Sequence, residues 1–217
     1  MKKFLALFLL LTIPLCLFAG CKTEKKPNKQ PESPKSSKEL FYEFLRGEIT
    51  ALDEHGEAKY LDGGFADILS DKAYHCFIDM NGDGEDDLCI ENPNSRLLVF
   101  TIKGGEVHHW YTAVPNGYYE EFLLLNNGAI LFKEVTKSKD GVKYRYYELD
   151  EIGNEKIKKE FARYDSVYLS IEDKTIPEHF LIDGKEVSKE EYEEKTAKYF
   201  EIGSDKIVWY DKDGNKV

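Results

Sequence analysis

The stretch FIDMNGDGEDDLCI, Phe77 to Ile90, places two apolar, strand-like runs on either side of a loop rich in Asp and Gly. Oxygen-bearing side chains stand at every second position of this loop: Asp79, Asn81, Asp83, Glu85 and Asp87. Calcium takes about 6 to 8 oxygen ligands and tolerates flexible geometry, so alternating oxygen donors on a tight loop suit this ion. The stretch therefore predicts a hairpin that holds a structural calcium ion.

Counting positions from Asp79 as the first distinguishes between known calcium loops. Gly84 at position six suits a sharp turn, and Glu85 at position seven offers its backbone carbonyl. An EF-hand closes its coordination with an acid at position twelve, which here is Ile90. The remaining pattern, Asp-x-Asn-x-Asp-Gly-x-x-Asp followed by Leu88, resembles the calcium loop of FG-GAP and VCBS-type repeats, which joins two antiparallel strands of a propeller blade.

The alternative is a polar hairpin turn, because turns favour Asp and Gly in any case. Without an ion, the carboxylates of Asp79, Asp83 and Asp87 would repel one another and the neighbouring Glu85 and Asp86. Magnesium fits this loop less well than calcium, since it demands near-octahedral geometry and keeps several waters. Repulsion between the acids thus favours a calcium ion over an empty turn.

The N-terminus is typical of a bacterial secretory signal. Lys2 and Lys3 precede the apolar run FLALFLLLTIPLCLF, which is too short for a membrane-spanning helix. The run ends in Phe18-Ala19-Gly20-Cys21, which resembles the lipobox of bacterial lipoproteins, although Phe18 replaces the usual Leu. This resemblance implies a signal peptide over residues 1–20, lipidation of Cys21, and a protein anchored in the cell membrane on its extracytoplasmic face. The alternative is an ordinary signal, with Cys21 left as a free thiol.

The segment that follows Cys21 has the composition of a disordered tether. Residues 22–38 are rich in Lys, Pro and Ser and have no apolar side chain that could join a core. They carry six Lys and two Glu, a net charge of +4, and the signal adds two Lys. Because the whole chain has a net charge of −11, residues 39–217 carry −17. A domain this acidic repels nucleic acid. The remainder is long enough for one domain with one core.

A helix is predicted first, followed by successive antiparallel hairpins. Ser36 and Glu39 form a capping-box pattern, and apolar residues share one helical face as far as Leu52. The strand-like runs are Tyr74 to Ile78, Asp87 to Glu91, Leu97 to Ile102, Val107 to Val114, Tyr118 to Leu125, Ala129 to Thr136, Val142 to Leu149, Lys156 to Tyr164, Val167 to Ile171 and Lys206 to Tyr210. Ser188 and Glu191 predict a second helix, to about Phe200.

Glycine-containing turns such as Gly104-Gly105 and Asn127-Gly128 join these runs and indicate a β meander. The chain has no strict repeat and one complete calcium loop. The predicted fold class is therefore α+β, mainly an antiparallel meander with an N-terminal helix and a short C-terminal helix, and not a full propeller.

Other chemistry-bearing residues give weaker signals. His108 and His109 are adjacent, so they point to opposite faces of a strand and make poor joint metal ligands. Asp211-x-Asp213-Gly214-Asn215 echoes the calcium loop but is too near the end of the chain to complete it, which predicts a turn or a frayed end. Cys76 and Cys89 flank the calcium loop; they either form a disulfide across the hairpin or stay reduced as small buried residues.

Three functions fit these features. The first is a lipid-anchored calcium-binding module that contacts the membrane through its anchor and binds an envelope polysaccharide or protein. The second is a cell-wall or glycan hydrolase that uses a pair of carboxylates, for which the sequence identifies no catalytic residue. The third is a structural or immunity-type lipoprotein without a small ligand. The whole pattern resembles uncharacterised lipoproteins of low-GC Gram-positive bacteria, and this resemblance implies no activity.

Overall fold

The computed structural model describes residues 34–61, 65, 73–92, 96–115, 119–136, 141–169 and 174–217. From Lys35 to Val217 they belong to one compact unit. The predicted signal peptide, Cys21 and the tether up to residue 33 lie outside the described residues.

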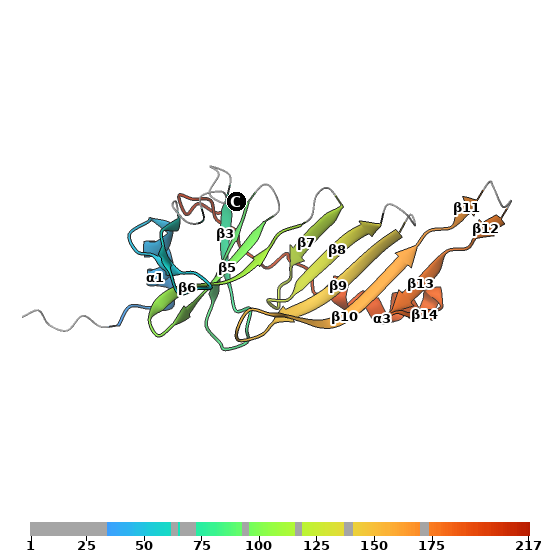
Figure 1. The fold of residues 1–217 in the computed structure, drawn as a ribbon, viewed down its shortest axis with the longest axis horizontal. Coiled ribbons are helices and arrows are strands. Elements are labelled where there is room, and N and C mark those ends of the chain that lie inside the picture. The colour runs from blue at the N-terminus through green and yellow to red at the C-terminus, as the bar shows by residue number, and fades with distance from the viewer. Residues whose placement is uncertain are drawn as a thin grey trace, which may run out of the picture. The chain divides into compact units, whose positions relative to one another are not determined.

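Two six-stranded sheets and one small two-stranded sheet make up the β structure (Figure 1). The first sheet has the order β2-β1-β6-β5-β4-β3, and its strands are β1 (Ala51–Leu52), β2 (Ala58–Lys59), β3 (Tyr74–Ile78), β4 (Asp87–Glu91), β5 (Leu97–Lys103) and β6 (Glu106–Ala113). All its neighbouring strands are antiparallel except β1 and β6, which are parallel.

The second sheet is entirely antiparallel and has the order β14-β13-β10-β9-β8-β7. Its strands are β7 (Glu120–Leu124), β8 (Ile130–Thr136), β9 (Gly141–Leu149), β10 (Glu155–Tyr164), β13 (His179–Ile182) and β14 (Lys185–Val187). The small sheet pairs β11 (Val167–Leu169) with β12 (Lys174–Ile176). The predicted α+β fold, mainly antiparallel with one helix near each end of the unit, is confirmed.

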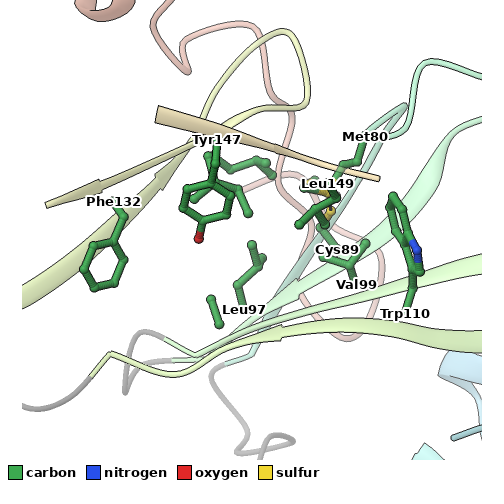
Figure 2. Packing of buried hydrophobic residues seen from close by; sticks show 12 residues of the cluster. Met80, Cys89, Leu97, Val99, Trp110, Phe132, Tyr147 and Leu149 are labelled. Carbon is green, nitrogen blue, oxygen red and sulfur yellow. Dashed lines mark hydrogen bonds between the residues drawn. The ribbon is translucent and has the colours of Figure 1, made fainter. Parts of the chain in front are cut away.

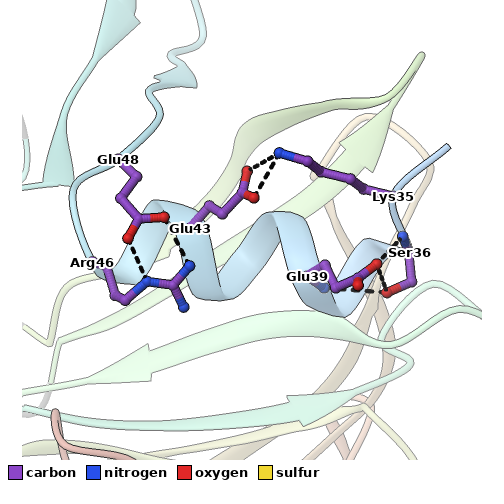
Figure 3. Close-up of polar contacts among 6 residues, drawn as sticks. All are labelled: Lys35, Ser36, Glu39, Glu43, Arg46 and Glu48. Atoms are coloured by element: carbon purple, nitrogen blue, oxygen red, sulfur yellow. Dashed lines mark hydrogen bonds and ion pairs between the residues drawn. The ribbon is translucent and has the colours of Figure 1, made fainter. Parts of the chain in front are cut away.

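The first helix, α1 (Ser37–Leu45), begins at the predicted capping box (Figure 3). The Ser36 hydroxyl accepts a hydrogen bond from the Glu39 backbone N–H at 3.3 Å, and the Glu39 carboxylate accepts one from the Ser36 N–H at 2.8 Å. These bonds satisfy backbone donors that the first helical turn leaves open. The ion pairs of Lys35 with Glu43 and of Arg46 with Glu48 lie at the surface, where such pairs add at most about 1 kcal/mol.

The helix prediction was too long at its C-terminal end. Gly47 has a φ of 70°, a left-handed conformation that ends a helix and favours glycine. Ile49 therefore lies beyond the helix, and Leu52 belongs to strand β1. The second predicted helix is confirmed as α3 (Lys189–Glu201), whose N-cap Ser188 accepts a hydrogen bond from the Glu191 N–H at 3.1 Å.

Three clusters of buried side chains fill the spaces between these elements. In the first, Phe41 and Phe44 of α1 pack on one face of the first sheet. In the second, Cys89 and Val99 from the other face of that sheet meet side chains of β8 and β9 from the second sheet (Figure 2). The third cluster lies where Tyr192 of α3 packs on the opposite face of the second sheet. Both main sheets are thus covered on both faces along part of their length.

The C-terminal segment differs from the predicted last strand, Lys206 to Tyr210. Within it, Tyr210 forms isolated bridges to His75 and to Lys216. The backbone N–H of each of His75 and Tyr210 donates to the carbonyl of the other, at 2.9 and 2.8 Å. The end of the chain is therefore fixed to strand β3, whose other edge pairs with β4.

Candidate metal centre and its surroundings

The predicted calcium loop joins β3 to β4, two strands in the register Ile78 opposite Asp87. The loop backbone turns sharply at two glycines, Gly82 with φ 77° and Gly84 with φ 90°. Residues with a Cβ rarely adopt such angles. The expected positive φ at Gly84, the sixth position, is therefore confirmed.

Side-chain oxygens inside the loop hold its backbone in a series of turns. The two carboxylate oxygens of Asp79 accept hydrogen bonds from the N–H groups of Gly82 at 2.6 Å and Gly84 at 3.0 Å. Asn81 accepts from the Asp83 N–H at 2.8 Å, and Asp83 accepts from the Glu85 N–H at 2.8 Å. Three of the five predicted ligand residues are thereby oriented by the loop itself.

Asp87, the fourth residue predicted to bind calcium through its side chain, is the buried one. Only 2% of its surface is exposed, and its carboxylate accepts from the Met80 N–H at 3.1 Å. The pKa of Asp87 is raised to about 6: burial is the largest cause, hydrogen bonds from Thr101 and Met80 oppose it, and the charges of Asp83 and Asp79 add to it. The loop therefore brings three carboxyl groups close enough to act on one another.

Glu85, predicted to act through its backbone carbonyl, contacts α1 with its side chain. Its side chain accepts a hydrogen bond from the Ser37 hydroxyl of α1 at 3.1 Å. Because α1 holds the Glu85 side chain, only the backbone carbonyl of Glu85 is left as a candidate ligand.

The donor set fits a hard cation such as calcium. All the side chains are oxygen donors, and a buried negative charge beside two others is costly unless a cation or a proton neutralises it. Over the described ranges, however, no three His, Cys, Asp or Glu side chains are grouped closely enough to hold a metal ion. The described loop thus has the oxygen donors that calcium prefers and places carboxylates near one another, but these do not form a complete coordination shell.

The second sheet packs directly on the start of the loop. Gly128, in the turn between β7 and β8, approaches so closely that a Cβ placed there would lie 2.2 Å from the Asp79 carbonyl oxygen and 2.8 Å from the Met80 Cα. Its φ of 77° also favours glycine. The Asn127-Gly128 pair, predicted only as a turn, therefore also sets the distance between the loop and the second sheet.

Two open hollows border the loop. One is lined by Gly84, Glu85 and Asp86 together with the first turn of α1. The other is lined by Asn81, by Glu148 near the end of β9, and by the β9–β10 turn with Asp150 and Glu151. The loop thus faces hollowed surface on both sides.

Two acids of the second hollow, Glu148 and Asp150, are engaged in structural contacts. Glu148 pairs with Lys158 at 2.8 Å. Asp150 accepts hydrogen bonds from the N–H groups of Ile152 and Asn154, and bonds from Asn154 are the largest cause that lowers its pKa. A general acid needs a raised pKa, so this arrangement does not favour the hydrolase hypothesis.

Cys76 and Cys89 lie directly opposite each other on β3 and β4. Both are fully buried free thiols in the second cluster, and the Cys89 thiol donates to the Met80 sulfur at 3.1 Å. Burial raises the pKa of Cys89 well above its ordinary value. The register is compatible with a cross-strand disulfide, and that bond stays a prediction.

His108 and His109 lie side by side on β6 without forming a metal site with each other. His109 shares a hydrogen bond of 2.7 Å with the Thr112 hydroxyl, and its ring packs against Phe65 and Phe100. Burial lowers the pKa of His109. Its role is therefore that of a neutral core residue.

The sequence analysis did not identify a type of turn that occurs three times in the structure. Asp53, Asp150 and Asp211 each start a turn with glycine three residues later, and each carboxylate accepts hydrogen bonds from the N–H groups two and four residues on. The signal for it is the repeated spacing Asp-x-x-Gly. The predicted turn at Asp211 to Asn215 is confirmed as one of these.

No helix in the described part of the chain is long and apolar enough to cross a membrane. Comparisons of the chain with protein-family models, with curated proteins and with solved structures found no match.

Proposed function

We propose that this protein is a lipid-anchored, extracytoplasmic calcium-binding module with a binding or structural role at the cell envelope. The observation that carries the calcium part of the proposal is the burial of Asp87 beside Asp79 and Asp83 in a loop of oxygen donors. Such a group of like charges is stabilised by a divalent cation, which supplies the opposite charge at short range.

In this proposal, the side chains of Asp79, Asn81, Asp83 and Asp87 hold the ion, with the Glu85 carbonyl and water. The ion would supply positive charge and rigidity. The chain's own residues position it: Gly84 lets the loop turn, and Gly128 holds the second sheet against Asp79. Calcium binding would therefore stiffen a hairpin on which both sheets meet.

The anchor part of the proposal rests on the sequence around Cys21 and predicts lipid labelling in a bacterial host. Cys21→Ala should abolish incorporation of a labelled fatty acid and release or misprocess the protein, since the thiol is the acceptor that the lipobox resemblance implies. Labelling is read from the immunoprecipitated chain.

Cys16→Ala is the matched control, because Cys16 lies in the apolar run of the same signal and its loss should leave labelling intact. Wild-type labelling and processing of the Cys21→Ala variant would contradict the lipoprotein assignment.

A further inference from the structure

A third hollow lies on the second sheet, on the face that α3 covers. Its lining comes from three elements: Val142 and Tyr144 of β9, Arg163 of β10 with Asp165 just beyond it, and Tyr192 and Phe200 of α3. None of these residues contributes to the calcium loop. The hollow is therefore a separate candidate site.

Strand register explains why these side chains meet. Tyr144 lies opposite Phe161, and Val142 opposite Arg163, so all four project from one face of the antiparallel pair. Tyr192 and Phe200 are eight residues apart on α3, a spacing that places them on one side of a helix. The sheet and the helix thus each contribute aromatic side chains to the same hollow.

Tyr192 offers its hydroxyl to the hollow. Only 7% of this residue is exposed, and no hydrogen-bond partner of its hydroxyl is found among the described residues. Burial is the main cause that raises its pKa to about 12, while Tyr144 raises it and Arg163 lowers it. Among the described residues the hydroxyl is not one of the buried polar atoms without a partner; it is open to the hollow that Tyr192 lines, where a ligand can bond to it.

The aromatic rings of the hollow contact one another and are partly open to solvent. Phe161 stacks on Tyr144 with a centroid distance of 5.3 Å, and the Phe200 ring stands at 89° to that of Tyr144, 5.2 Å away. Phe200 remains 45% exposed although it is fully apolar. An aromatic face carries partial negative charge, which attracts the weakly positive C–H groups of a ring such as a pyranose.

The charges beside this wall compensate one another. The Arg163 guanidinium donates to Asp165 at 3.0 Å and lies 3.4 Å from a carboxylate oxygen of Glu178, which Lys189 approaches to 3.9 Å. Two positive and two negative groups leave little net charge, so neither an anion nor a cation is selected. The guanidinium has five N–H donors, enough to bind hydroxyl oxygens in addition to its ion pairs.

We infer that the hollow between α3 and strands β9 and β10 binds a neutral saccharide unit. The C–H face of the sugar ring would pack on Tyr144 and Phe200, while its hydroxyl groups would bond to Arg163, Asp165 and the Tyr192 hydroxyl. A neutral glycan is favoured over an acidic one because residues 39–217 carry a net charge of −17, which repels anions. The inference deepens the envelope-binding role proposed above, on which it rests for the location of its ligand.

The test titrates the full-length chain in detergent with three neutral oligosaccharides, chitotetraose, cellotetraose and maltotetraose, and with an acidic tetragalacturonate. Binding is measured by calorimetry and by saturation-transfer NMR. At least one neutral sugar should bind, and Phe200→Ala should weaken that binding about tenfold or more, since aromatic anchors dominate such sites. Tyr192→Phe, which removes one oxygen, should weaken it by a smaller factor.

Matched controls separate this site from general surface effects. Leu123→Ala removes an apolar side chain that is 44% exposed on β7, and Tyr199→Phe removes a hydroxyl from the same helix. Both should bind the sugar as the wild type does. An unchanged melting temperature of each variant shows that it folds. If Phe200→Ala does not fold, Tyr192→Phe still tests the inference.

Three results would overturn the inference: no binding of any neutral sugar at millimolar concentration, tighter binding of the acidic sugar, or binding that neither Phe200→Ala nor Tyr192→Phe weakens. Each is distinguishable from failure of the proposed function, because calcium-dependent melting and lipid labelling involve none of these side chains.

Discussion

Two Asp-Gly segments of this chain have similar sequences, but the pKa of a key carboxyl group is lowered in one and raised in the other. In the turn from Asp211 to Asn215, one carboxylate accepts bonds from the N–H groups of Asp213 and Asn215 and from the Asn215 side-chain amide, at 2.8 to 3.0 Å. Its hydrogen bonds with Asn215 hold the pKa of Asp211 below the ordinary value. In the loop from Asp79 to Asp87, the buried carboxyl group of Asp87 has a pKa raised to about 6.

The difference lies in what surrounds each carboxylate. Asp211 is satisfied by backbone donors and faces solvent, so the turn is complete without an ion. Asp87 is shielded from water and is close to two other acids. Composition alone does not distinguish a self-sufficient turn from a cation site; burial and the crowding of like charges do.

The largest expected effect tests whether the second sheet positions the loop. In Gly128→Ala, the new Cβ would collide with the Asp79 carbonyl oxygen at 2.2 Å, so we expect a loss of about 4 kcal/mol in the free energy of unfolding. Gly214→Ala is the control: its φ of 80° is equally unfavourable, but no atom lies within 4 Å, and about 1 kcal/mol should be lost. Urea unfolding measures both, and equal losses would show that Gly128 does not restrain the loop.

A disulfide between Cys76 and Cys89 would fix the ends of the loop, a restraint that the Asp211 turn does not have. Protein made in an oxidising compartment should then show no free thiol from this pair after denaturation and alkylation. By the loop-entropy relation, the bond would add about 3 kcal/mol to the free energy of unfolding, which reduction would remove. Full alkylation of both cysteines without a reductant would show instead that the pair is reduced.

A smaller effect follows from the raised pKa of Asp87 and concerns the calcium-free protein. The folded state binds this proton more tightly than the unfolded state, so the penalty for the buried charge is present above the folded pKa of about 6 and is relieved as pH falls below it. Between pH 7.5 and 5, this group should add about 1.4 kcal/mol to the free energy of unfolding. Saturating calcium should remove the gain, because the ion holds Asp87 ionised.

Asp87→Asn is the control for this pH effect. His75 and His109 have lowered pKa values and therefore destabilise the fold as pH falls in the same range, so the difference between wild type and variant isolates Asp87. A variant with the same pH profile as the wild type would show that Asp87 ionises in the fold as it does in the unfolded chain.

Local sequence signals predicted most of the fold. Alternating apolar residues and glycine turns identified β3 and β4 from Tyr74 to Glu91 with the bounds that the structure has, and capping residues placed the start of both helices. These features depend on neighbours in the chain. The same is true of the loop, where Gly84 adopts the predicted positive φ.

Contacts between segments far apart in the chain could not be predicted from the sequence. The two-residue strands β1 and β2 are too short to show alternation, and the parallel pairing of Ala51 with Val107 joins distant segments. The division into two sheets and the approach of Gly128 to Asp79 depend on tertiary packing. The hollow at Tyr192 unites β9, β10 and α3, and its aromatic residues look like ordinary core positions in the sequence.

The most direct test of the central claim compares the two Asp-Gly segments in thermal unfolding with calcium and with a chelator. Asp79→Ala combined with Asp83→Ala removes two acids from the loop, and Asp211→Ala combined with Asp213→Ala removes two acids from the terminal turn. A ligand that binds only the folded state stabilises it by about 2.7 kcal/mol at a hundredfold excess over its Kd.

We expect calcium to raise the melting temperature of the wild type and of the terminal-turn variant, and to leave that of the Asp79/Asp83 variant unchanged. If the wild type melts at the same temperature with calcium and with chelator, the loop is an ordinary turn and the central claim is wrong.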